Sequence, residues 1–365
     1  MSPARSPWHG GPVEVRRIES DDDAGLDESA DVLRASDKDM WPDLEGFSRR
    51  DIRGFARFRG GSRRFDMVAA REGSGPILGV GLMERTLRDN LHAMEVTVAV
   101  HPSSRRRGVG TALVAGMGDF ARADGRDVLN SIVDVPVAVA ASHPSLTFAP
   151  KVGFVPTLAG NTRHLALPIA AGRLEELRDV VAGARNAADY RMLTFAGPWP
   201  EEFADDACEL FRRMSTDEPA GDEEHHEEVW DTQRLREREV LLSARGAATF
   251  TAVAQHQPSG RLVALTELQV SPDAPTQASQ MVTVVHPEHR GHRLGLAAKL
   301  ANLDALALGA PDARLIVTGN AAVNAPMIAV NEMMGFTVAG EGMFWQKHLG
   351  ATATSATAAG RINEG

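Results

Sequence analysis

The segment that decides the fold occurs twice in this chain. Residues 96–117 read VTVAVHPSSRRRGVGTALVAGM, and residues 281–302 read MVTVVHPEHRGHRLGLAAKLAN. At a constant offset of 185 residues, the two segments share a His-Pro pair, an arginine three positions after it and a glycine five positions further on. A second match follows downstream, where residues 151–154 (KVGF) correspond to residues 333–336 (MMGF) at an offset of 182. Two matched blocks in the same order indicate an internal duplication.

Around the repeated segments, both copies have the same order of expected elements. Each begins with a strand (14–18; 190–195) and a helical region (22–35; 201–214), followed by three β-rich runs (65–70, 77–83 and 94–100; 248–254, 262–270 and 280–285). A helix then starts at the glycine loop (109–122; 294–308), and a strand (128–133; 315–318), a short helix and closing strands complete the copy. We therefore predict an α/β protein with a mixed α+β sheet and two domains, residues 12–168 and 190–349. Residues 169–189 would be a linker that contains a helix, and the small, polar tail 350–365 is expected to be disordered.

Composition narrows the class of protein. Apolar residues make up 43% and charged residues 24% of the chain, as in ordinary globular proteins. The formal net charge of −10 argues against a nucleic-acid partner. The single cysteine, Cys208, excludes a disulfide framework and is expected to be a buried apolar filler. Because no apolar run reaches the roughly 18 residues of a membrane span, we expect a cytoplasmic protein with no membrane partner. We expect it to be a monomer or a homodimer.

The repeated segment has the chemistry of an anion site. A strand, a His-Pro turn, an arginine and a glycine loop lead into a helix, whose first backbone N–H groups and dipole favour a phosphate. The P-loop pattern GxxxxGK[ST] is absent, and a dinucleotide fingerprint would open the first βαβ unit, whereas Gly108-Val109-Gly110 follows several strands. The pattern that remains is Arg-x-x-Gly-x-Gly, residues 105–110.

These segments resemble the acyl-CoA pyrophosphate-binding segment of the GNAT acetyltransferase superfamily. Residues 151–154 and 324–336 resemble the short helix ending in Gly-Phe that follows it in that superfamily, so the resemblance covers both predicted domains. The duplication resembles tandem, mycothiol-synthase-like members. The resemblance implies acetyl-CoA or another acyl-CoA as cofactor. It also implies that the pantetheine arm lies between splayed fourth and fifth strands, bonded to strand backbone, where one N–H polarises the thioester carbonyl.

Carried over position by position, the resemblance implies a cofactor-binding set in each copy. In the first copy it comprises Val98, Val100, Arg105, Arg106, Arg107, Gly108, Val109, Gly110 and Thr111. In the second copy it comprises Val284, Val285, Arg290, Gly291, His292, Arg293, Leu294, Gly295, Leu296, Asn320, Asn324 and Asn331. Arg293 replaces the first loop glycine, and its side chain either crowds the pyrophosphate or contacts it. Because the second copy has asparagines where the first has His143-Pro144-Ser145, we predict that the C-terminal domain is catalytic.

The acid and the base are less well marked. The tyrosine that often protonates the leaving thiolate in this superfamily corresponds to Ala149 and Asn331, and the only tyrosine, Tyr190, lies elsewhere. Glu267 and Glu95, on strands, are the candidate bases, although an isolated strand carboxylate is also a common solvated surface residue. His101 and His286 are expected to stabilise turns.

The stretch 217–228 contains seven acidic residues and no Lys or Arg. It is either a solvated surface or an electrostatic funnel for a cationic amine, which the resemblance would place at the acceptor site of the second copy. His225-His226 within it has no further ligand spacing, so we predict no metal site. The sequence thus predicts an acyl-CoA-dependent N-acyltransferase that acts directly on a small-molecule amine. A non-catalytic acyl-CoA-binding module and a protein or peptide N-acetyltransferase remain alternatives.

Overall fold

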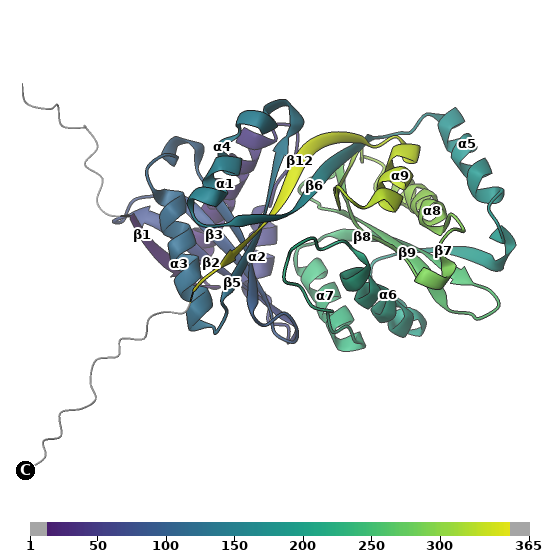
Figure 1. Cartoon of the computed structure of the whole chain (residues 1–365), viewed down its shortest axis with the longest axis horizontal. Coiled ribbons are helices and arrows are strands. Elements are labelled where there is room, and N and C mark those ends of the chain that lie inside the picture. The colour runs from purple at the N-terminus through teal and green to yellow at the C-terminus, as the bar shows by residue number, and fades with distance from the viewer. Residues whose placement is uncertain (1–12, 351–365) are drawn as a thin grey trace, which may run out of the picture.

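A single mixed sheet of twelve strands runs through both halves of the chain (Figure 1). The computed structural model describes residues 13–350, so residue 12 and nearly all of the predicted tail lie outside the described residues. The strand order is β1-β2-β3-β4-β5-β12-β6-β11-β10-β9-β8-β7, with helices on both faces. The predicted α/β class with a mixed sheet is confirmed. No helix among residues 13–350 is long and apolar enough to cross a membrane.

The elements repeat in the same order in the two halves. The first half contains β1 (Val13–Ile18), α1 (Asp23–Met40), α2 (Arg49–Arg57), β2 (Arg63–Glu72), β3 (Ile77–Thr86), β4 (Ala93–Val100), α3 (Val109–Ala123), β5 (Val128–Pro136), α4 (Pro144–Lys151) and β6 (Val155–Ala166). The second half contains α5 (Ala171–Ala182), β7 (Tyr190–Ala196), α6 (Ala204–Asp217), α7 (Thr232–Ala244), β8 (Ala248–His256), β9 (Leu262–Val270), β10 (Gln277–Val285), α8 (Leu294–Gly309), β11 (Leu315–Ala321), α9 (Ala325–Met334) and β12 (Thr337–His348). Helices α2 and α7 were not expected from the sequence, and α5 lies in the predicted linker.

The two halves exchange their last strands. β12, from the end of the chain, pairs antiparallel with β5 of the first half from Gly340↔Pro136 to His348↔Val128. β6, from the first half, pairs antiparallel with β11 of the second half, and β6 and β12 also pair with each other. Figure 1 shows both strands passing between the two ends of the molecule. Each closing strand therefore completes the sheet of the other half. The domain limits 12–168 and 190–349, which follow chain order, remain a prediction.

The cores follow this exchange. Trp345 and Leu349, near the C-terminus, pack against α3 with Leu113 and Met117 in the core of the first half. Leu165 of β6 packs in the core beneath α8 of the second half. Cys208 is buried in the core formed by α6, as expected.

Each half opens a gap between two parallel strands. β4 and β5 pair only from Ala93↔Val128 to Glu95↔Asn130, although both strands continue. β10 and β11 pair only from Gln277↔Leu315 to Ser279↔Val317. A β-bulge between Gln280 and Val282 interrupts β10, whereas β4 keeps a continuous register with β3. The expected splay is present in both copies, and the bulge is present only in the second.

The exchange predicts that a residue of the C-terminal strand stabilises the first half. Trp345→Ala removes a side chain that is 6% exposed in the core beside α3, and it should lower the free energy of unfolding by about 3–5 kcal/mol. Val338→Ala, on the same strand but 45% exposed, should change it by no more than about 0.5 kcal/mol. Urea unfolding measures both, and equal small effects would contradict the exchange.

Candidate functional site

The two glycine loops share one backbone path. After a short 3-10 helix (Pro102–Ser104; Pro287–His289), each loop has two left-handed residues before its helix begins. They are Arg106 (φ 65°) and Gly108 (φ 84°) in the first half, and Gly291 (φ 84°) and Arg293 (φ 59°) in the second. A left-handed arginine costs about 1–2 kcal/mol, and each loop contains one. The rest of each loop therefore holds its arginine in this conformation despite the strain. The substitution at Arg293 therefore leaves the backbone of the anion site intact.

Arg105 and Arg290 brace the loops. Nε of Arg105 donates to the carbonyl of Val100 at 3.3 Å, and the guanidinium pairs with Asp39 at the end of α1. Arg290 repeats this with the carbonyl of Val285 at 3.2 Å and with Asp217 of α6 at 2.6 Å. Both guanidinium groups are already paired with aspartates. The expected contact of these arginines with the pyrophosphate is therefore not favoured. The backbone N–H groups at the starts of α3 and α8 are the better anion donors.

Strand alternation determines which backbone groups face each gap. The N–H of His101 donates to the carbonyl of Leu78 in β3, so the backbone groups of Val98 and Val100 point the other way, toward β5. The N–H of His286 likewise donates to Val263 of β9, so Val285, and not Val284, faces the second gap.

The asparagines that favoured the C-terminal half have structural partners. The side chain of Asn324 caps α9 by accepting a hydrogen bond from the N–H of Met327 at 3.3 Å. Nδ2 of the buried Asn331 donates to Oδ1 of Asn320 at 3.3 Å, and Asn320 donates to the carbonyl of Ala321. These bonds join β11 to α9, so the reason for preferring the second copy loses its force.

Glu267 does not have the free carboxylate that a base requires. Its side chain is 1% exposed, and both of its oxygens accept hydrogen bonds from Arg238 of α7, one of them at 3.0 Å. Gln269 donates a third hydrogen bond at 2.9 Å. This pattern is that of a buried ion pair that holds α7 on β9.

The second gap holds an amide and a lysine instead of an acid. Gln280, the counterpart of Glu95 in the duplication, donates to the carbonyls of Glu267 and Val282 at 2.7 and 2.9 Å. Its Oε1 lies 3.3 Å from Nζ of Lys299, a buried residue of α8 that replaces Val114 of the first copy. Burial lowers the pKa of Lys299 to about 7, because desolvation disfavours the charged form.

Glu95 stands at the point where the first gap opens. It forms the last β4–β5 pair with Asn130, whose Nδ2 donates to Oε1 of Glu95 at 2.9 Å. Glu95 is solvent-exposed, because it lines the open cavity, so its pKa shift comes from the protein atoms that crowd the carboxyl and not from exclusion of water. Burial among these atoms raises the pKa of Glu95 to about 7; the Asn130 hydrogen bond opposes the shift, and repulsion from Glu223 and Glu84 adds to it.

The cavity beside Glu95 has a volume of about 130 Å³ and is lined by both halves. The first half contributes Glu84, Asn90 and Asn130, and the second contributes Glu224, His225 and Glu228. Arg63 also lines it, but its guanidinium is paired with Glu84. The cavity is therefore net negative and suited to a cationic ligand.

The acidic stretch faces the first half. Residues 218–231, between α6 and α7, form what we call the lid segment. The N–H of His226 donates to Oδ1 of Asn90 at 2.7 Å, and Nδ2 of Asn90 donates to the carbonyl of His226 at 3.0 Å. Further along, the N–H of Val229 donates to Asp89, which also forms a buried ion pair with Arg234 of α7. These hydrogen bonds tie the stretch to the first half, which the sequence did not indicate.

The remaining candidates lie apart from this cavity. Ala149 is buried in the core beside α3, and the Tyr190 hydroxyl lies 3.1 Å from Nδ1 of His289, by the loop of the second half. Asn130 and His92, which do border the cavity region, were missed. An asparagine in an apolar strand and a histidine in a loop have no distinctive sequence signal.

Comparison with known proteins agrees with this geometry. The sequence model of the acetyltransferase (GNAT) family matches residues 30–154, from within α1 to the start of β6. No curated protein matches the chain. A solved tandem GNAT protein from the clavulanic acid biosynthesis pathway is 28% identical with a TM-score of 0.75, over 93% of this chain and 100% of that one. A GCN5-related N-acetyltransferase from Sphaerobacter thermophilus is 14% identical with a TM-score of 0.62, over 93% of this chain and 97% of that one, and supports the fold alone.

The family match, the tandem relative and the duplicated splay with its anion-binding loop agree. Residues 30–154 match the acetyltransferase (GNAT) family, and the whole chain has the fold of a tandem GNAT protein; both findings support N-acetyltransferase activity with acetyl-CoA as the acyl donor.

Proposed function

We propose that acyl transfer takes place in the first half, at the β4–β5 gap, with Glu95 as the general base and a small cationic amine as the acceptor. The observation that carries this proposal is the position of Glu95, at the mouth of the gap and beside an acidic cavity. The second half offers Gln280 and a buried Lys299 at the corresponding place. This proposal reverses the sequence-based preference for the C-terminal domain.

The residues of the cavity have distinct roles in this proposal. Bound acetyl-CoA supplies the acyl thioester. The net negative charge of the cavity attracts the ammonium form of the acceptor, and Glu95 accepts its proton, directly or through one water. Asn130 holds the Glu95 carboxylate through its amide, and a β4 N–H that faces the gap would be placed to donate to the thioester oxygen of bound acetyl-CoA. Ala149 stands at the usual acid position and cannot donate a proton, so in this proposal water would protonate the thiolate of the cofactor.

The pKa and the size of the cavity both fit this role. A base with a pKa near 7 is unprotonated in a large fraction of molecules at neutral pH and still accepts a proton readily. A cavity of about 130 Å³ beneath the lid segment suits a small amine better than the side chain or N-terminus of a folded protein.

Glu95→Gln removes the base while keeping the shape of the side chain. We expect kcat to fall on the order of 10²–10⁴-fold. In the unsubstituted protein, kcat/KM should rise with pH through about 7 in proportion to unprotonated Glu95, and Glu95→Gln should lose this step. Steady-state kinetics over pH 5–9, to be measured with an amine panel and acetyl-CoA, test both expectations.

Glu223→Gln is the matched control. It removes a charge that raises the pKa of Glu95, so the step in the pH profile should move to lower pH while substantial activity remains. A profile that is unchanged in both variants would contradict the assignment of Glu95.

Glu267→Ala should act on stability instead. It leaves Arg238 without its partner on β9, and breaking such a pair costs about 3 kcal/mol of unfolding free energy. Where the variant remains folded, the pH step at about 7 should persist. Urea unfolding with the exposed Glu175→Ala as control measures the loss, and a stable Glu267→Ala without the pH step would restore Glu267 as the base.

A further inference from the structure

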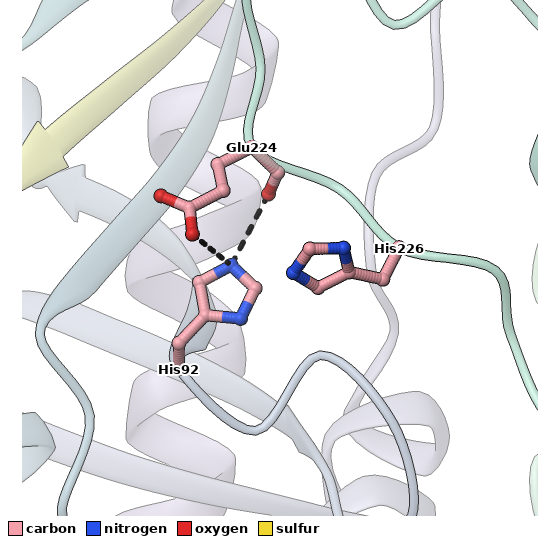
Figure 2. Close-up of side chains that lie close together, drawn as sticks. All are labelled: His92, Glu224 and His226. Atoms are coloured by element: carbon pink, nitrogen blue, oxygen red, sulfur yellow. Dashed lines mark hydrogen bonds and ion pairs between the residues drawn. The ribbon is translucent and has the colours of Figure 1, made fainter.

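Three metal-ligating side chains from the two halves meet beside the Glu95 cavity (Figure 2). His92 comes from the loop before β4, and Glu224 and His226 come from the lid segment. One ligand atom of each lies within 4.8 Å of the other two. Nε2 of His92 is 3.8 Å from Oε1 of Glu224, and the two imidazole rings have centroids 5.2 Å apart. Figure 2 shows the three side chains directed toward a common point.

Two imidazoles and one carboxylate form a ligand set that suits zinc. Tetrahedral zinc with bonds of about 2.1 Å places its ligand atoms about 3.4 Å apart, so these groups need to close by little more than an ångström. Glu224 and His226 are exposed and His92 is half-buried, so side-chain rotation can supply this movement. His92 Nε2 now donates to the carbonyl of Glu224 at 3.2 Å, and a coordinate bond to the same nitrogen would replace that hydrogen bond.

The backbone that carries these ligands is already held in place. Asn90, two residues before His92, forms the two hydrogen bonds with the backbone of His226. Asp89 binds the same region, because it accepts a hydrogen bond from the N–H of Val229 in the lid segment and forms a buried ion pair with Arg234 of α7. Since both loops are positioned before any ion arrives, binding costs less ordering entropy than it would in free loops.

We propose that His92, Glu224 and His226 bind Zn²⁺ or a similar divalent transition-metal ion across the two halves, fastening the lid segment beside the Glu95 cavity. Ion binding is argued from the three ligands alone. Only the role of the fastened lid segment at an active site depends on the proposed function. The sequence-based expectation of no metal site considered only the pair His225-His226. The third ligand lies more than 130 positions earlier, in the other half.

A second cluster, His286, Glu288 and His289, provides the internal control. All three belong to one short loop of the second half, and His289 is engaged with the Tyr190 hydroxyl. In the sequence this cluster lies next to Arg293, whose positive charge disfavours a cation. We therefore expect the tight site at His92 and not here.

The test is a Zn²⁺ titration of the chelator-treated full chain in competition with a chromophoric chelator. One tight site is expected. His92→Asn and His226→Asn should each lower the affinity for Zn²⁺ by at least about tenfold. Even the loss of a residue that only hydrogen-bonds to a metal ligand lowers metal affinity about 10–100-fold. His289→Asn and Glu95→Gln should bind Zn²⁺ as tightly as the unsubstituted chain, so a failure of the Glu95 assignment would not affect this result.

Limited proteolysis supplies the second readout. Zn²⁺ should slow cleavage within the lid segment of the unsubstituted chain and leave cleavage of His92→Asn unchanged. Absence of a tight site, loss of binding in His289→Asn, or equal binding in all variants would overturn the proposal. So would a tight site that leaves lid cleavage unchanged.

Discussion

The exchange of β6 and β12 is the constraint on which the rest of the molecule depends. Each strand forms a hydrogen-bonded ladder with the half that did not supply it, so the two halves share one sheet. The exchanged strands also reach the site. Gln346 of β12 donates to Oδ1 of Asn130, and Thr157 of β6 accepts a hydrogen bond from the N–H of Asp222 in the lid segment. The strand exchange therefore braces both the residue that orients Glu95 and the segment that covers it.

The two halves of the duplication share a similar backbone arrangement but have different side chains at their gaps. Both loops keep the same pair of left-handed residues, and both braces repeat, as Arg105 with Asp39 and as Arg290 with Asp217. The gaps differ, because Glu95 faces an open acidic cavity while Gln280 is tied to a bulged strand above a buried lysine. In our account the second half serves the first by covering its site.

The sequence predicted the parts of this structure that depend on local pattern. The duplication, the glycine loops and the order of the elements other than α2 and α7 follow from periodicity and from glycine positions. The strand exchange could not be predicted, because the residues of β12 favour a strand without specifying which sheet it joins. Glu267 was a plausible base only while its partner Arg238, on a helix that was not expected, was unknown. The acidic stretch was recognised, but its contacts with the first half were not, since charge in a loop does not indicate what the loop packs against.

The account depends most on which gap receives the cofactor. A crystal structure with a non-hydrolysable acetyl-CoA analogue tests this directly. The predicted result is a pantetheine arm between β4 and β5, hydrogen-bonded to the backbone of Val98 and Val100, with the acyl group beside Glu95. An analogue bound only between β10 and β11, with its acyl group near Gln280, would contradict the account and return catalysis to the second half.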